Sequence, residues 1–279
     1  MKKYTTHIKA KTGWFDIDIK EVYQYRDLIW LFFKRSYTAM YKQTILGPLW
    51  LIFNPLISVA MYAFVFGGLA GLSTSGVPQF VFYLSSNAMW SFFATCVKNT
   101  SSTFTANSGI LGKVYFPRLV MPLSSVFSGL LTLGIQIGML IITMIIYALT
   151  GYRFEVGGTM LMIPLIIIQT ALLGLGVGII IASLTTKYRD LAVLVEFGIQ
   201  LWMYATPVVY TSDIIPRKYY SIYMINPMSP IMECWRNITI GSGVFLWKYW
   251  GISCGITIFL LLSGIILFSK IEKTFMDTI

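Results

Sequence analysis

The chain has 279 residues, of which 56% are hydrophobic and only 11% charged, and its mean hydropathy is +0.72. Soluble domains carry about 25% charged residues, so these values exclude both a soluble globular protein and a disordered chain. The formal net charge of +10 can indicate a nucleic-acid partner. Here the placement of the basic residues along the chain is explained by membrane topology, and we expect no nucleic-acid binding.

Residues 1–42 form a distinct N-terminal segment, because they hold nine of the 21 basic and four of the 11 acidic residues. They contain no apolar core followed by a cleavage site, so no secretory signal is expected. At helical periodicity one face is apolar, comprising Val22, Tyr25, Leu28, Ile29, Phe32 and Phe33. The pattern predicts an amphipathic helix that lies on the membrane surface or docks on a partner. A simple lipid anchor fits the pattern equally.

Residues 43–279 are predicted to form a transmembrane domain. Long stretches lack any charged side chain, and a spanning helix needs only about 20 mostly apolar residues. The pattern predicts an all-α, polytopic membrane protein with six transmembrane helices. These helices are expected at about 45–66, 80–98, 119–149, 159–184, 191–210 and 247–268.

The distribution of Lys and Arg predicts the orientation of the chain. Basic residues accumulate on the cytoplasmic side of a membrane protein. With a cytoplasmic N-terminus, 16 basic residues lie inside and five lie outside. We therefore expect both termini in the cytoplasm.

Residues 211–246 are too polar and too rich in proline for a span, yet they carry many aromatic and methionine side chains. This composition predicts external helices between spans five and six that re-enter the membrane, where protein or a water-filled cavity covers their backbone. Glu233 and Arg236 are three residues apart, so they are expected to form an ion pair on one helix face.

The sequence lacks the motifs that an enzyme of this size would need. No phosphate-binding loop is present, and the one histidine, His7, lies in the N-terminal segment. The three cysteines are too few for a disulfide framework, although a single Cys234–Cys254 bridge stays open. No acidic residue lies at the centre of a predicted span, where cation-coupled transporters place one. We expect no metal, no cofactor bound by this chain, no enzymatic activity, and an energy source in another subunit.

Glycine pairs and aromatic residues are the remaining signals. The pairs Gly134/Gly138, Gly174/Gly178 and Gly251/Gly255 predict close helix contacts, either inside the subunit or at a dimer seam. Aromatic residues cluster toward the predicted outer ends of three spans. They form either an interfacial belt or a lining on which sugar rings stack, and the candidates are Tyr62, Phe66, Phe82, Tyr83, Trp90, Trp202, Tyr204 and Tyr210.

Four segments together resemble the membrane subunit of polysaccharide ABC exporters, which are type-2 ABC permeases for O-antigen, capsule-like and teichoic-acid polymers. The first is 41–50 with Asn54-Pro55-Leu56, and the second is 113–118 with Pro122-Leu123. The third is 188–190 with 201–210, and the fourth is 226–228 with Glu233 and Arg236. The C-terminal residues 271–277 are similar as well, so the resemblance covers nearly the whole chain.

The resemblance implies a homodimer in the bacterial cytoplasmic membrane, bound to two copies of a separate ATPase that holds ATP and Mg²⁺. It implies export of a lipid-linked, O-antigen-like polysaccharide that enters from the cytoplasmic leaflet. Lys34, Arg35 and Lys42 would suit a pyrophosphate head group, although topology alone also places basic residues there. The residues that correspond to the ATPase contacts are Arg26, Asp27, Lys113, Tyr115, Arg118, Lys187, Arg189 and Asp190.

Two alternatives stay open at this point. A type-2 ABC permease could carry teichoic acid, drugs or small lipids instead of an O-antigen. A membrane-embedded polymer-assembly enzyme or scaffold would transport nothing, but it would need a clustered acid–base set that the sequence does not contain.

Overall fold

The computed structural model describes residues 19–42, 45–103, 106–107, 109, 116–155, 160–185 and 191–274. Within these ranges every regular element is a helix, which confirms the predicted all-α class. The longer helices are α1 (Ile19–Gln24), α2 (Arg26–Tyr41), α3 (Trp50–Tyr62), α4 (Gln79–Ser101), α6 (Val120–Leu149), α7 (Ile163–Thr185), α8 (Leu191–Tyr204), α9 (Arg217–Tyr223), α10 (Met228–Ile240) and α11 (Trp247–Thr274). Four short helical segments accompany them, namely η1 (Gly47–Leu49), η2 (Ala63–Leu69), η3 (Met160–Met162) and η4 (Ser212–Ile214).

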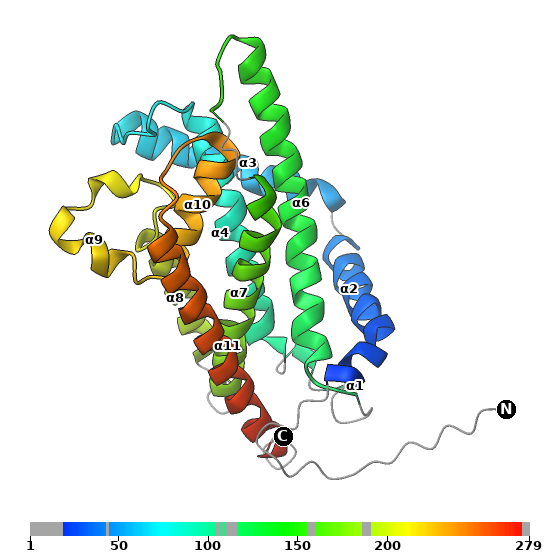
Figure 1. Ribbon diagram of the computed structural model, residues 1–279. Coiled ribbons are helices and arrows are strands. Elements are labelled where there is room, and N and C mark those ends of the chain that lie inside the picture. Colours follow the sequence, from blue (N-terminus) through cyan, green and yellow to red (C-terminus); the bar gives the residue numbers. More distant parts are fainter. Residues whose placement is uncertain are drawn as a thin grey trace.

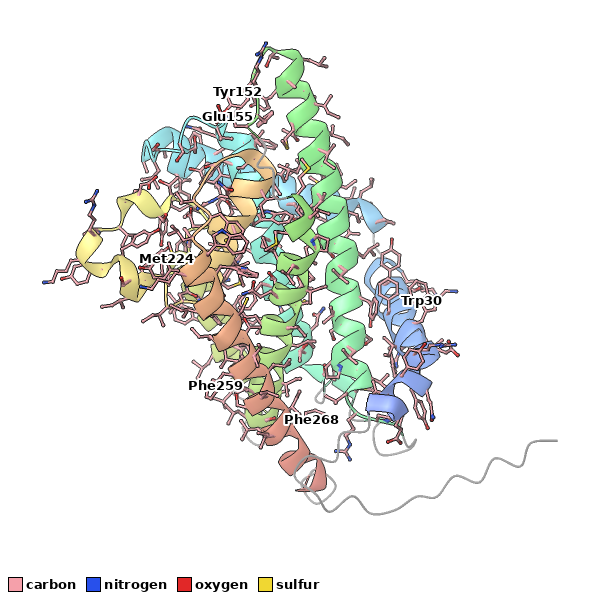
Figure 2. All side chains as sticks on the ribbon, in the orientation of Figure 1. Trp30, Tyr152, Glu155, Met224, Phe259 and Phe268 are labelled. Atoms are coloured by element: carbon pink, nitrogen blue, oxygen red, sulfur yellow. The ribbon has the colours of Figure 1, made fainter. Side chains whose placement is uncertain are left out.

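Five helical stretches in the described part of the chain are long and apolar enough to cross a membrane: Gly47–Leu69, Gln79–Ser101, Val120–Leu149, Met160–Thr185 and Trp247–Phe268. Their bounds agree with five of the six predicted spans to within about three residues. Large apolar side chains point outward from them, as Phe259 does on α11 (Figure 2). An outward-facing apolar surface of this kind is what a lipid environment requires. The chain is a multi-pass membrane protein.

The fifth predicted span is shorter than the expected 191–210. Helix α8 ends at Tyr204 and has 14 residues, which corresponds to about 21 Å of helix against a hydrocarbon core of about 30 Å. Pro207 explains the early end, because proline lacks the backbone N–H that would continue the helix. Residues 205–210, which end with Tyr210, form turns and bends instead. The count of six complete spans therefore stays a prediction.

Helix α4 lies at the centre of the bundle. It packs against α6 and α7, while α7 packs in turn along α11 (Figure 1). Of the most apolar part of α4, 78% is buried, against 22% for α6 and for α11. Polar side chains inside the bundle pair with each other: Asn87 on α4 donates to Gln136 on α6, and Gln169 on α7 donates to Ser253 on α11. Such pairs join helices where lipid offers no hydrogen-bond partner.

Glycines allow α7 to approach its neighbours closely. A Cβ atom at Gly174 or Gly178 would lie 2.6 Å from the Cβ of Cys96 or of Thr100 on α4. These two glycines therefore pack inside the subunit. The other two predicted glycine pairs have no heavy atom within 4 Å of such a Cβ, so they make no close contact with any residue that the structure describes. The described cysteines Cys96, Cys234 and Cys254 are free thiols, which excludes the Cys234–Cys254 bridge in this structure.

The N-terminal helix packs against its own subunit. The sequence predicted one amphipathic helix on a membrane surface or on a partner, but the structure breaks it at Tyr25 into α1 and α2. Their apolar face contacts Phe116, Val120, Met121 and Phe268, and the rings of Phe32 and Phe116 are 5.7 Å apart. Trp30 points away from this contact and is 61% exposed (Figure 2). Five of the six residues predicted for the apolar face belong to this cluster, whereas Phe33 packs against Trp30. Contact of the helix with a membrane surface or with a partner stays a prediction.

Residues 205–246 fold back against the bundle. Helix α10 is largely buried and packs among α4, α7 and α11, while α9 lies at one side of the molecule (Figure 1). Buried α10 side chains include Met228, Ile231 and Trp235, and the Trp235 indole donates to the Ser85 carbonyl on α4. This protein cover is what the re-entrant prediction requires. How deep the segment lies in the membrane stays a prediction.

Candidate functional site

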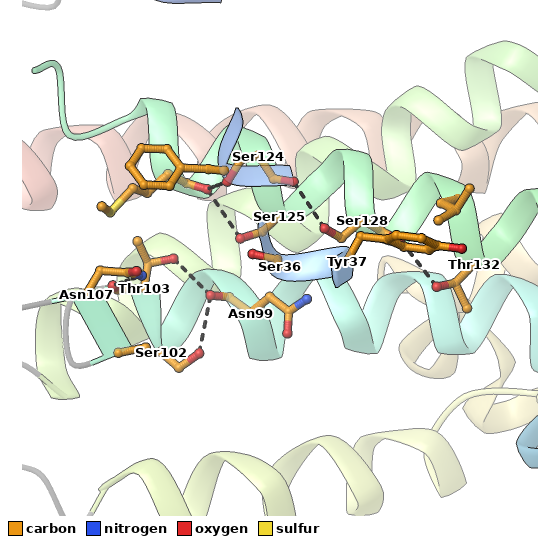
Figure 3. A pocket seen from close by; sticks show the side chains of 14 residues that line it. Ser36, Tyr37, Asn99, Ser102, Thr103, Asn107, Ser124, Ser125, Ser128 and Thr132 are labelled. Carbon is orange, nitrogen blue, oxygen red and sulfur yellow. Dashed lines mark hydrogen bonds between the residues drawn. The ribbon is translucent and has the colours of Figure 1, made fainter. Parts of the chain in front are cut away.

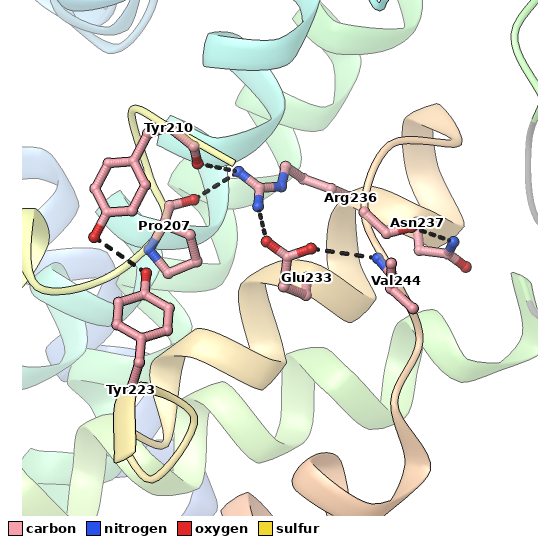
Figure 4. Close-up of polar contacts among 8 residues, drawn as sticks. Pro207, Tyr210, Tyr223, Glu233, Arg236, Asn237 and Val244 are labelled. Carbon is pink, nitrogen blue, oxygen red and sulfur yellow. Dashed lines mark hydrogen bonds and ion pairs between the residues drawn. The ribbon is translucent and has the colours of Figure 1, made fainter. Parts of the chain in front are cut away.

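A buried ion pair between Glu233 and Arg236 lies at the centre of the 205–246 segment (Figure 4). The side chain of Arg236 is fully buried, and that of Glu233 is 4% exposed. The two residues sit on one face of α10, as their three-residue spacing suggests. The guanidinium carbon of Arg236 also lies 4.8 Å from the centre of the Phe82 ring, an attractive cation–π arrangement.

The pair also fixes two irregular segments of backbone. Arg236 Nη1 donates to the carbonyl of Pro207 at 2.6 Å and to that of Tyr210 at 3.1 Å. On the other side, the Val244 N–H donates to Glu233 Oε2 at 3.3 Å. These bonds satisfy much of the hydrogen-bonding capacity of the two buried charges, as a buried ion pair requires, although the buried Arg236 Nε donates to no described residue. The pair therefore holds the chain that follows α8, helix α10 and the turn before α11 in one arrangement.

Asn226 is a second polar junction, which the sequence did not single out beyond its part in the resemblance. Its amide nitrogen donates to the Ala205 carbonyl and to the Thr206 hydroxyl, at 3.0 and 2.9 Å. Its amide oxygen accepts from the Trp202 indole and from the Met228 N–H, at 2.9 and 3.2 Å. One side chain thus joins the end of α8 to the start of α10. The available signal was a polar residue directly before proline in an otherwise aromatic segment.

The aromatic residues predicted to line a path divide into two groups. Phe82, Tyr83 and Trp90 are buried in the core of the subunit, with exposed fractions of 0%, 1% and 5%. Their prediction as lining residues is wrong for this arrangement, because α4 is the central helix and its rings pack against neighbouring helices. Tyr204 is 54% exposed, and the rest are partly exposed, namely Tyr62, Phe66, Trp202 and Tyr210.

The partly exposed group lies where α3 and α8 flank α4. The Tyr62 hydroxyl on α3 lies 3.5 Å from the sulfur of Met203 on α8, and Trp202 packs edge-on against Phe93 of α4. Tyr210 and Tyr223 are joined through their hydroxyls at 3.1 Å. Rings of α3 and α8 therefore pack against α4, since Tyr62 also contacts Tyr83.

Comparison with known proteins identifies the family. The model of the ABC-2 type transporter family matches residues 27–240, which is more than half of the chain. The chain belongs to the ABC-2 type transporter family. It is 32% identical to an O-antigen export system permease protein RfbA of Klebsiella pneumoniae, over 90% of this chain and 94% of that protein. It is also 26% identical to an O-antigen export system permease protein RfbA of Myxococcus xanthus, over 79% of this chain and 83% of that protein. It is 22% identical to the polysialic acid transport protein KpsM of Escherichia coli, over 88% of this chain and 94% of that protein.

The residues of this ABC-2 chain expected to contact an ATPase lie at one end of the bundle, as far as the structure describes them. Arg26 and Asp27 are exposed at the start of α2, where Arg26 donates to the Tyr23 hydroxyl at 3.1 Å. Arg118 is half-buried, just before α6. Both segments belong to the cluster that joins α1 and α2 to residues 116–121. The other candidates, Lys113, Tyr115, Lys187, Arg189 and Asp190, lie outside the described residues.

Proposed function

We propose that this chain is the membrane subunit of an ATP-driven ABC-2 exporter that moves a lipid-linked cell-surface polysaccharide across the bacterial cytoplasmic membrane. The observation that carries the proposal is the similarity to O-antigen export permeases over about nine-tenths of both chains. An O-antigen-like polymer is therefore the preferred substrate class. The chain is a transport subunit and not an enzyme, and ATP and Mg²⁺ are bound by a separate nucleotide-binding ATPase.

The assembly proposed is a homodimer with two ATPase copies. Its support is an apolar surface on α3 and α8 that the rest of the described chain leaves largely uncovered. Only 11% of the most apolar part of the first span is buried, and α8 exposes Val193, Leu194, Phe197 and Leu201. A second copy would cover part of this apolar surface, and the partly exposed aromatic rings beside it would then border the path between the copies.

The proposed orientation places the end with α1, Arg118 and the C-terminal end of α11 in the cytoplasm. The excess of basic residues on that side supports this orientation. The ATPase would then bind near Arg26, Asp27 and Arg118. The re-entrant segment with Glu233 and Arg236 would lie toward the outer face.

The docking role of Arg118 leads to a direct test. We expect Arg118→Glu to weaken ATPase binding about 30-fold, because an arginine that acts as an interface hot spot contributes about 2 kcal/mol and about 1.4 kcal/mol changes affinity tenfold. Co-purification of a tagged ATPase with the permease from detergent extracts measures the effect. Arg153→Glu is the matched control, since Arg153 is exposed at the opposite end of the bundle.

Arg118 is half-buried, so the stability of the variant must be compared with wild type in the absence of the ATPase. Arg118→Lys, which keeps the charge, should retain most of the binding. Normal ATPase recovery with a folded Arg118→Glu variant would remove this residue from the proposed interface.

The transport function is tested by depleting the protein in its own host and locating the lipid-linked polysaccharide. We expect finished polymer to accumulate at the inner leaflet while the surface loses it. Surface labelling with a lectin or antibody, divided by the total polymer in cell extracts, gives the fraction of polymer at the cell surface. An unchanged surface would refute polysaccharide export and would favour the alternatives of drug or small-lipid transport. A wild-type copy supplied in trans controls for effects on neighbouring genes.

A further inference from the structure

A polar cleft of about 220 Å³ lies between α2, the end of α4 and the start of α6 (Figure 3). Among the residues that the structure describes, eight hydroxyl side chains, two carboxamides and four apolar residues line it, and none of these fourteen is charged. Cations on α2 do not reach it, because Lys34, Arg35 and Lys42 line a separate groove on another face of that helix. The described lining of the cleft is therefore polar and uncharged.

Hydroxyl groups of the cleft donate their protons to backbone carbonyls of their own helices, which leaves their lone pairs for a ligand. Thr132 donates to the Ser128 carbonyl, Ser124 to that of Met121, and Thr103 to that of Asn99, at 3.2, 2.7 and 2.8 Å. Each hydroxyl has one proton and two lone pairs, so these groups keep accepting capacity for a ligand. The Asn99 carboxamide makes no hydrogen bond to another residue that the structure describes, and it can both donate and accept.

These properties select a ligand class. A phosphate would require cationic or backbone N–H donors, whereas a neutral group rich in hydroxyls can donate to the accepting side chains. The volume equals that of about seven bulk waters, which leaves room for one sugar ring. Phe32 and Tyr37 supply an aromatic wall, and Tyr37 extends toward Thr132 (Figure 3). Aromatic faces suit the apolar C–H faces of a sugar while its hydroxyls stay hydrogen-bonded.

The position of the cleft fits a membrane-anchored ligand. It lies along the first turns of α6, which has 30 residues and thus a length of about 45 Å. This exceeds the hydrocarbon core of about 30 Å, so the start of α6 can reach the interface where head groups lie. A hydroxylated surface exposed at that level needs a polar occupant, because lipid tails cannot satisfy it.

We propose that this cleft binds one neutral sugar unit of a membrane-anchored glycolipid before transport. The proposal rests on the proposed function for the identity of the natural ligand, but the binding itself is testable without it. The site is separate from the aromatic rings beside α3 and α8 and from the basic groove on α2.

Binding of a ligand in the cleft can be measured by how far it protects an introduced cysteine from reaction with a maleimide. We would place Ser128→Cys, and independently Ser125→Cys, in a Cys254→Ser background, since Cys96 and Cys234 are buried. In lipid nanodiscs, dodecyl glucoside should slow maleimide labelling about tenfold at ten times its Kd. Dodecyl phosphate, with the same chain and an anionic head, should not protect. Ser221→Cys, on the exposed helix α9, should be labelled equally with and without either probe.

A matched pair of variants tests the hydroxyl contacts. Thr132→Val should raise the Kd for dodecyl glucoside about fivefold, the loss expected from one hydrogen bond. Thr143→Val should not change it, because Thr143 makes the same contact to the carbonyl four residues earlier on α6 but lies outside the cleft. Unchanged labelling with the glucoside, or equal protection by both probes, would overturn the proposal. If depletion leaves surface polymer unchanged, the proposed function fails, whereas selective protection by the glucoside would still establish a sugar site.

Discussion

Arg236→Leu is expected to destabilise the folded protein by about 3–5 kcal/mol, the typical effect of removing one partner of a buried ion pair. The change leaves the Glu233 carboxylate buried without its cation. It also removes the donor that holds the carbonyls of Pro207 and Tyr210. The free energy of unfolding in mixed detergent micelles, followed by tryptophan fluorescence, measures the loss. Export should fail in the same variant, because the segment between α8 and α11 loses its arrangement.

Two further variants separate the buried charge from a general effect of mutation. Adding Glu233→Gln to Arg236→Leu should recover part of the lost stability, because the uncompensated charge is then gone. Lys98→Met breaks the exposed pair between Lys98 and Glu196, whose side chains are 61% and 58% exposed, and should have little effect on stability because solvent screens the pair. If Arg236→Leu and Lys98→Met had equal effects, the Glu233–Arg236 pair would not be the structural centre of the segment.

The sequence predicts much of this architecture because lipid imposes simple rules. Long uncharged stretches define five helices, and the periodicity of residues 22–33 identifies the apolar face of the N-terminal helix. The partner of that face was not predictable, because apolar periodicity shows only that a face is covered. The covering residues, such as Phe116 and Phe268, lie far apart in the chain.

In the candidate sites, too, contacts between residues far apart in the chain could not be predicted. A three-residue spacing was enough to predict the contact of Glu233 with Arg236, since both lie on one helix. Burial of Phe82, Tyr83 and Trp90 depends on α4 being the central helix, which local composition does not reveal. The cleft is formed by hydroxyl residues from three helices. Its only local sign is the four-residue repeat of Ser124, Ser128 and Thr132 in an apolar span.

Gly176→Leu is expected to disrupt the packing of α7 against α11. A Cβ atom at Gly176 would lie 2.8 Å from the backbone nitrogen and 2.9 Å from the Cα of Leu261. Backbone atoms cannot rotate away as a flexible side chain can, so the helices must separate. On the facing side, a Cβ at Gly264 would lie 2.9 Å from the Gly176 carbonyl oxygen. Overpacking in a tight core costs about 3 kcal/mol at the upper end of its usual range.

Gly134→Leu is the matched control, because no heavy atom lies within 4 Å of a Cβ at that position. It removes a glycine from the interior of a helix, which by itself favours the helix by up to about 1 kcal/mol. Unfolding in denaturing detergent should therefore begin at a lower concentration for Gly176→Leu and at an unchanged or higher one for Gly134→Leu. Equal resistance of the two variants would mean that α7 and α11 do not meet backbone to backbone. The two helices would then lie farther apart than the hydrogen bond from Gln169 to Ser253 implies.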